Sequence, residues 1–182
     1  MSPDLPPALR AAADRLLEGV ARKGLAERAE KISQAYRAGR TSAGVVADQA
    51  DATAYVLARL PATYAAGARA LAEAVERAPS FAPASLLDAG SGPGGVAWAA
   101  LETWPGLEWA VLLDSNRAFL EMSKTLAQDA PAVLREAERV KADLTAPEAW
   151  PRADLVIASY ALAEIPAARQ AATIEGLWAA CA

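Results

Sequence analysis

The sequence predicts an α/β fold in which an all-helical region precedes a parallel β-sheet. Apolar residues recur at helical intervals up to about residue 84, and after that they form short strands that alternate with helices. Four glycines also gather between the first of these strands and the helix that follows it. We therefore expect a helical N-terminal region over residues 1–84 and a sheet domain over residues 85–182.

The helical region is rich in Ala, Leu, Arg and Glu, which are all strong helix formers. Breaks are expected near Gly24, at residues 38–40 and near Pro61. Thr41 or Ser42 is expected to cap the helix after the second break. Pro61 suits the first turn of a further helix, where its missing N–H costs nothing.

The sheet domain is expected to contain four buried strands, over residues 85–88, 109–113, 138–141 and 154–158. Helices are expected over residues 95–103, 117–127 and 167–180. Because buried strands that alternate with helices run parallel, this pattern predicts a sheet wound with helices.

Composition excludes several kinds of site in these 182 residues. There is no histidine and a single cysteine, Cys181, so the chain holds no Ser-His-Asp triad, no histidine-ligated metal and no internal disulfide. We expect no metal site. The first residues lack a basic segment followed by an apolar one, and no long apolar stretch is free of charge. We therefore expect a cytoplasmic protein that does not enter membranes.

The net charge of −4 argues against a general nucleic-acid binder. Basic residues nevertheless outnumber acidic ones by eight to four in residues 10–40. Such charges are typical of the solvated faces of helices, and contact with nucleic-acid phosphates is the other interpretation.

The most informative stretch joins the first strand to its helix: Asp88-Ala89-Gly90-Ser91-Gly92-Pro93-Gly94. Glycines permit positive φ angles and a close approach of backbone to a ligand, and the helix N-terminus offers free N–H groups. We call residues 90–94 the glycine loop. Its spacing also satisfies a dinucleotide fingerprint, because Asp114 follows about 20 residues on. The glycine pattern alone therefore does not distinguish a dinucleotide from other nucleotide-like ligands.

Asp88 favours one of these ligands. Its carboxylate would repel a dinucleotide pyrophosphate but would attract, directly or through water, a ligand that has an ammonium group and no phosphate. S-adenosylmethionine (SAM) is such a ligand. A nicotinamide oxidoreductase is the less favoured alternative, because it conflicts with Asp88 and the chain has no histidine to relay a proton.

The pattern Asp-x-Gly-x-Gly-x-Gly resembles the first motif of the class I SAM-dependent methyltransferases, which have a Rossmann-like sheet. The resemblance implies that the glycine loop wraps the amino-acid part of SAM and that Asp114 accepts hydrogen bonds from the ribose hydroxyls. It also implies that Asp143 binds the adenine amino group. Residues at the same strand ends complete the expected cofactor site: Ser115, Leu144, Ser159 and Tyr160.

Each position also has a structural interpretation that needs no ligand. Asp88 and the glycines could form only a tight turn, Asp114 could cap a helix, and Asp143 could cap a loop. Their joint position favours a site, because all three follow consecutive strands and open α/β sheets bind ligands at the carboxyl ends of their strands.

The run Ser-Tyr-Ala-Leu-Ala-Glu-Ile-Pro at residues 159–166 carries a more specific resemblance. Together with residues 86–98 and 59–66, it resembles a methyltransferase-like family associated with the small ribosomal subunit. That family occurs in bacteria and, as an assembly factor, in mitochondria. The resemblance implies an rRNA or ribosomal target. The family also has a cysteine-rich iron-sulfur segment further downstream, which this chain lacks, so no cluster ligands can be carried over.

The resemblance to methyltransferases implies that residues after the fourth strand contact the methyl acceptor, and here these include Ser159, Tyr160 and Glu164. They do not form the Asn/Asp-Pro-Pro-Tyr signature, and we assign no catalytic residue. Tyr160 is expected either to stack on a base or to pack in the interior. The sequence thus favours a methyltransferase acting on rRNA, with a catalytically inactive SAM-binding assembly factor as the alternative.

The sheet is expected to be truncated. Class I methyltransferases have seven strands, whereas this sequence ends soon after the fourth. We expect a fragment of a longer protein, whose exposed fourth strand would promote homodimers.

Overall fold

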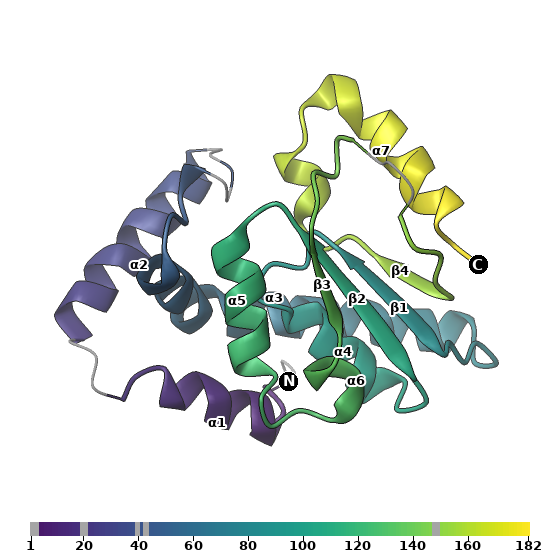
Figure 1. Ribbon diagram of the computed structural model, residues 1–182, viewed down its shortest axis with the longest axis horizontal. Coiled ribbons are helices and arrows are strands. Elements are labelled where there is room, and N and C mark those ends of the chain that lie inside the picture. Colours follow the sequence, from purple (N-terminus) through teal and green to yellow (C-terminus); the bar gives the residue numbers. More distant parts are fainter. Residues whose placement is uncertain (1–3, 19–21, 39–40, 42–43, 147–149) are drawn as a thin grey trace.

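A four-stranded parallel sheet forms the centre of the protein, with the strand order β3-β2-β1-β4 (Figure 1). The computed structural model describes residues 4–18, 22–38, 41, 44–146 and 150–182. The strands are β1 (Ser85–Ala89), β2 (Trp109–Asp114), β3 (Glu138–Lys141) and β4 (Leu155–Ile157). All four strands lie where the sequence predicts them, and the predicted α/β class is confirmed.

The register of the sheet brings the ends of neighbouring strands together. Asp88 of β1 lies beside Leu112 of β2 and Ile157 of β4, and Asp114 of β2 lies beside Lys141 of β3. Because the strands are parallel, the loops that follow them all leave from the same edge of the sheet.

The helices of the sheet domain are α4 (Gly95–Thr103), α5 (Arg117–Leu126), α6 (Ala132–Arg135), the 3₁₀ helix η2 (Ala161–Glu164) and α7 (Ala167–Ala179). The first, second and last of these lie where they are predicted. The sequence does not predict α6 and η2, because four residues are too few for apolar periodicity to appear. Figure 1 shows α7 at the upper right, away from the N-terminal helices.

The described N-terminal helices are α1 (Pro7–Arg15), α2 (Arg22–Arg37) and α3 (Gln49–Arg77). The predicted break at residues 38–40 is correct, since α2 ends at Arg37. The break near Gly24 is also confirmed, since α1 ends at Arg15 and α2 begins at Arg22, although Gly24 itself lies in the first turn of α2. Gly24 has no neighbour within 4 Å of an added Cβ, so this surface position tolerates a glycine without ending the helix.

The break near Pro61 is wrong, because Pro61 lies inside α3. A proline within a helix costs roughly 3 kcal/mol or more. The helix continues because residues on both sides of Pro61, including Leu60 and Tyr64, bury their side chains against the rest of the protein. Tertiary packing here outweighs the tendency of proline to end a helix.

The N-terminus of α3 is capped by Asp48, whose side chain accepts a hydrogen bond of 2.8 Å from the N–H of Asp51. The prediction of Thr41 as the cap is therefore wrong, because α3 starts eight residues later. Ser42, the other predicted cap, lies outside the described residues.

Alternate residues of the strands face two separate apolar layers. Leu86 and Leu112 pack with α1, α3, α4 and α5, whereas Leu87 and Val111 face the opposite side of the sheet. Helix α3 packs closely on α4, because a Cβ added to Gly67 would lie 2.9 Å from a methyl group of Val96. One apolar core thus joins the long N-terminal helix to the sheet, and a domain boundary at residue 84 stays a prediction.

The end of the chain pairs with a residue just before β4. Ala153 and Cys181 form a parallel bridge, with a hydrogen bond of 2.9 Å from the N–H of Ala153 to the carbonyl oxygen of Ala180. Cys181 lies just beyond α7, which ends at Ala179. In the part of the chain that the structure describes, no helix has the length and apolar character needed to span a membrane.

Candidate functional site

A cavity lies at the carboxyl ends of the four strands. Eight of the residues that the sequence predicts for a cofactor site line it: Gly90, Gly92, Asp114, Ser115, Asp143, Leu144, Ser159 and Tyr160. These residues follow four different strands, and the parallel register brings them together.

The other predicted residues do not line the cavity. Ala89 is fully buried beside Leu144, and Gly94 caps the N-terminus of α4. Ser91 and Pro93 belong to the loop but do not face the cavity. Asp88 lies beneath the glycine loop, on the side of β1 that faces α4.

The glycine loop takes a conformation that only glycine adopts easily. Gly90, Gly92 and Gly94 have φ angles of 75°, 55° and 84°. An added Cβ at Gly90 would lie only 2.4 Å from the Cβ of Ala161, whereas one at Gly92 would meet nothing within 4 Å. Gly90 is thus required by the close approach of η2, and Gly92 leaves open space beside the backbone.

Asp88 is a buried carboxyl group whose charged form the fold stabilises little. Its side chain is 1% exposed, and neither carboxylate oxygen has a hydrogen-bond partner among the described residues. Burial, together with the negative charge of Asp114, raises the pKa of Asp88 to about 7, and the backbone amide of Ala97 partly opposes this shift. The charged form is therefore costly unless a cation approaches the loop.

Asp114 faces the cavity and organises the loop above it. Its two oxygens accept hydrogen bonds of 2.7 Å from the N–H groups of Gly92 and Asn116. Burial raises the pKa of Asp114, the two amides oppose the shift, and the charge of Glu164 adds to it. Each carboxylate oxygen can accept more than one hydrogen bond, so Asp114 can still accept bonds from a ligand.

Asp143 adopts the loop-cap arrangement that the sequence also allows. One of its oxygens accepts hydrogen bonds of 2.8 Å from both the N–H and the hydroxyl of Thr145, which lower its pKa. The side chain is exposed at the cavity wall, so capping and ligand binding are compatible through its second oxygen.

Tyr160 has a strained backbone at the cavity mouth. Its φ of 61° and ψ of −11° place it in the left-handed region, which costs roughly 1–2 kcal/mol for a residue other than glycine. The residue is 62% exposed, so it does not pack in the interior. Strain of this kind concentrates at functional sites.

The sequence does not predict the aromatic wall opposite the strands, which Tyr36, Tyr55 and Phe119 form. The Tyr55 ring lies 4.7 Å from that of Phe119 and 6.0 Å from that of Tyr36, centroid to centroid. Burial raises the pKa of Tyr55 to about 12, and it also raises that of Tyr36. These residues belong to three different helices, so no spacing in the sequence signals that they meet.

Arg59 of α3 lies behind this wall. Its guanidinium carbon is 5.5 Å from the centroid of the Tyr36 ring, and its positive charge opposes the rise in pKa of both tyrosines. Its Nε is buried without a hydrogen-bond partner, and no carboxylate of the described residues pairs with it. A cation without an acidic partner thus lies close to a cavity rich in carboxylates.

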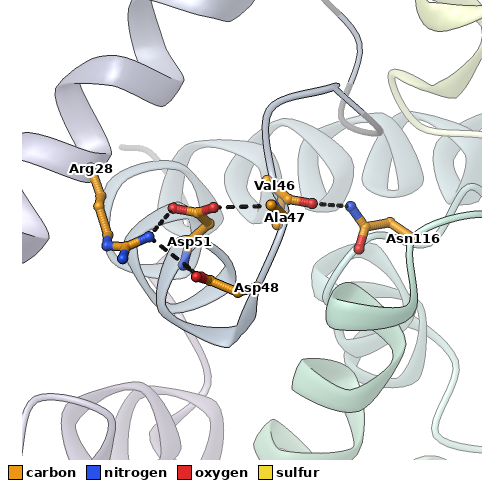
Figure 2. A network of polar contacts seen from close by, with 6 residues as sticks. All are labelled: Arg28, Val46, Ala47, Asp48, Asp51 and Asn116. Atoms are coloured by element: carbon orange, nitrogen blue, oxygen red, sulfur yellow. Dashed lines mark hydrogen bonds and ion pairs between the residues drawn. The ribbon is translucent and has the colours of Figure 1, made fainter.

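A polar network fixes the helices against the strand ends (Figure 2). Arg28 of α2 binds Asp51 and Asp48 at the start of α3, and Asp51 accepts a hydrogen bond of 3.1 Å from the N–H of Ala47. Asn116, which caps α5, donates a hydrogen bond of 2.8 Å to the carbonyl oxygen of Val46. The network links α2 and α3 to Asn116, whose N–H also donates to Asp114.

Comparison with known sequences identifies the family. Residues 49–182 match the family described as mitochondrial small ribosomal subunit Rsm22. The chain belongs to the Rsm22 family. It is also 30% identical over 135 residues to the human mitochondrial ribosome assembly protein METTL17, a match that covers 68% of this chain and 28% of that protein. The predicted resemblance to a methyltransferase-like family of the small ribosomal subunit is confirmed.

Solved structures show that this Rsm22-family chain has a methyltransferase-like fold. Human N-acetylserotonin methyltransferase in complex with SAM matches with a TM-score of 0.56 and 17% identity, over 84% of this chain and 45% of that one. Magnesium protoporphyrin IX methyltransferase from Synechocystis PCC 6803, with bound SAM, matches with a TM-score of 0.50 and 16% identity, over 68% and 59%. At these identities the likeness shows the fold alone.

The variant Asp88→Asn is expected to change how stability depends on pH. The carboxyl titrates near pH 7 in the folded protein but near 4 in an unfolded chain. Between these values the folded state binds more protons, so the wild type loses stability as the pH rises, by about 1.4 kcal/mol per unit. Asparagine does not titrate, and the variant avoids this loss.

Urea denaturation at pH 5 and pH 8 measures this effect. The free energy of unfolding of the variant, minus that of the wild type, should be roughly 3 kcal/mol larger at pH 8. An equal difference at both pH values would show that Asp88 titrates normally.

Proposed function

We propose that this Rsm22-family chain binds S-adenosylmethionine in the cavity and that it acts in the assembly of the small ribosomal subunit. The observation that carries the cofactor proposal is the pair of buried carboxylates, Asp88 and Asp114, at the ends of adjacent strands beneath and beside a glycine loop. SAM has an ammonium and a sulfonium group and no phosphate. A site of this charge stabilises such a cation and repels a pyrophosphate.

The remaining residues support the same ligand. Asp114 would accept the ribose hydroxyls through its remaining lone pairs, and the open space beside Gly92 leaves the backbone accessible to the amino-acid part. Asp143 and Leu144 would hold the adenine. The name of the human relative, a ribosome assembly protein, supports the cellular role.

Calorimetric titration tests the cofactor proposal. The wild type should release or absorb heat with SAM and none with NAD. Because Asp114 would bind the ribose directly, Asp114→Asn should weaken SAM binding about tenfold or more, as expected for a charged hydrogen bond of roughly 1.5–3 kcal/mol. Asp14→Asn, an exposed carboxylate on α1, is the matched control and should bind as the wild type does. No heat with SAM would refute the proposal.

Arg59 is suited to the carboxylate of the amino-acid part of SAM. The described residues that line the cavity supply three carboxylates, Asp114, Asp143 and Glu164, and no cation. A bound zwitterion needs a positive partner for its own carboxylate, and Arg59 lies directly behind the cavity wall at Tyr36 with its Nε unpartnered. A guanidinium binds a carboxylate with two parallel hydrogen bonds.

Arg59→Met tests this role with two ligands, SAM and decarboxylated SAM. The substitution should weaken SAM roughly 10- to 100-fold, because a charge-assisted pair is lost, and decarboxylated SAM less than threefold. Circular dichroism checks that the variant folds. If both ligands weaken equally, Arg59 supports the site only through packing on Tyr36.

Methyl transfer to rRNA is the second candidate function, and Tyr160 favours it. An exposed aromatic ring on a strained backbone at the cavity mouth provides a surface on which a base can stack. SAM supplies an electrophilic methyl group, so the protein need only hold the acceptor in line and exclude water.

Incubation with tritiated SAM and rRNA of the small subunit separates the two roles. A methyltransferase should incorporate label, and Tyr160→Ala should reduce the rate about tenfold or more, since stacking contributes roughly 1–3 kcal/mol per base, while SAM binding stays within twofold. Binding of SAM without any incorporation would assign the chain to assembly alone.

A further inference from the structure

A second hollow runs along β3, the edge strand on the side of the sheet away from β4, and it is lined mostly by basic residues. Arg117 and Lys124 come from α5, Arg135 from α6, and Arg139 and Lys141 from β3. Glu121 is the only acidic residue among the described residues that line it. We call this hollow the basic groove.

The periodicity of the elements explains why these charges gather. Arg117 and Lys124 lie seven residues apart, two helical turns along one face of α5. Arg139 and Lys141 lie two residues apart, so they share one face of β3. These segments are separated in the sequence, and the basic groove exists only because the fold places β3 beside α5.

The cations of the basic groove are weakly compensated. Arg117 forms a long ion pair of 3.9 Å with Glu121, and Arg135 forms one of 2.9 Å with its neighbour Glu136, both on the surface. Exposed pairs of this kind contribute little and leave the charge available. Lys124 and Lys141 have no ion pair with any described residue.

Arg139 forms the floor of the basic groove and is bound only by neutral groups. Its guanidinium donates hydrogen bonds of 2.9 Å to the Ser123 hydroxyl, 2.7 Å to the carbonyl oxygen of Ala137 and 2.9 Å to that of Leu134. It is half-buried, and this burial lowers its pKa. The fold thus holds a positive charge in place, and no carboxylate of the described residues lies within ion-pair distance of it.

In the basic helices of residues 10–40, more of the cations have an acidic partner. Four of their arginines pair with acids in the structure: Arg10 with Asp4, Arg15 with Asp129, Arg28 with Asp48 and Asp51, and Arg37 with Glu30. Most of these pairs are exposed, like those of the groove, so the difference is one of number: four arginines of these helices have an acidic partner, against two of the five cations of the groove.

We propose that the basic groove binds the sugar-phosphate backbone of a single-stranded RNA segment, an inference that rests on the proposed role in ribosome assembly. The groove leads to the cavity: Arg117 follows the cavity residue Ser115 by two positions, and Lys141 directly precedes Ala142, which also lines the cavity. An RNA segment bound in the basic groove would therefore end at the mouth of the cavity, beside Tyr160.

The triple variant Lys124→Gln, Arg135→Gln, Lys141→Gln tests the proposal. It leaves Arg139 intact, because Arg139 also joins β3 to α5 and α6, and the three substituted side chains are exposed. The matched control removes three exposed cations from the other basic surface: Arg10→Gln, Lys23→Gln, Arg37→Gln. The probe is a fluorescent 20-nucleotide oligouridylate, and anisotropy is measured from 50 to 200 mM salt.

The groove variant should bind the probe at least tenfold more weakly at 100 mM salt, and the control should stay within twofold of the wild type. The slope of log affinity against log salt should fall by about 2 in the groove variant, since each lost phosphate contact on a single strand contributes about 0.7. The single charge reversal Lys124→Glu should weaken binding in the same direction, which guards against a folding defect in the triple variant.

Three results would overturn the proposal: no binding of the probe by the wild type, equal affinities for the groove variant and the wild type, or an equal loss in the control. Competition with polyglutamate of matched charge adds a fourth, because a polypeptide that displaces RNA equally well would assign the groove to an acidic protein. SAM titration of the same variants should be unchanged. A failure of SAM binding alongside intact RNA binding would refute the cofactor proposal and leave the groove.

Discussion

The buried charge of Asp88 is the constraint on which the rest of the site depends. The side chain lies near the end of β1 in the interior and has no hydrogen-bond partner among the described residues, and the charge of Asp114 on the neighbouring strand β2 acts on it. An unpaired buried charge is costly, and none of the described residues supplies a cation to Asp88. The backbone amide of Ala97 opposes the rise in the pKa of Asp88 only in part, and the N–H of Gly92 donates to Asp114. A cationic ligand above the glycine loop would supply the missing charge.

The helices before the sheet complete the site rather than merely precede it. Asn116 joins the end of β2 to the carbonyl oxygen of Val46, and Arg28 joins α2 to the start of α3 (Figure 2). These bonds hold Tyr36 and Tyr55 opposite the strand ends, so that an aromatic wall faces an acidic one. The fold thereby lines one cavity with aromatic side chains and carboxylates that come from distant parts of the chain.

The sequence predicts what local patterns determine, and it misses what the tertiary structure decides. Short apolar runs and the glycine loop locate the strands, and the acids at the strand ends follow from parallel topology. Pro61 misleads because packing on both sides of it outweighs the local cost of a proline in α3. Tyr36 and Arg59 carry no signal, since a helical residue reveals its neighbours on its own helix and not the cavity that it reaches. The pairing of arginines in residues 10–40 is equally invisible until the acids are placed in space.

Titration of the Asp88 carboxyl carbon by ¹³C NMR, in the free protein and with SAM, tests the central claim most directly. The free protein should give a pKa of about 7, because burial and Asp114 disfavour the charged form. Bound SAM should lower this pKa, because its positive charge favours the carboxylate. A pKa near 4 in the free protein, or one that SAM leaves unchanged, would contradict a buried charge that awaits a cationic ligand.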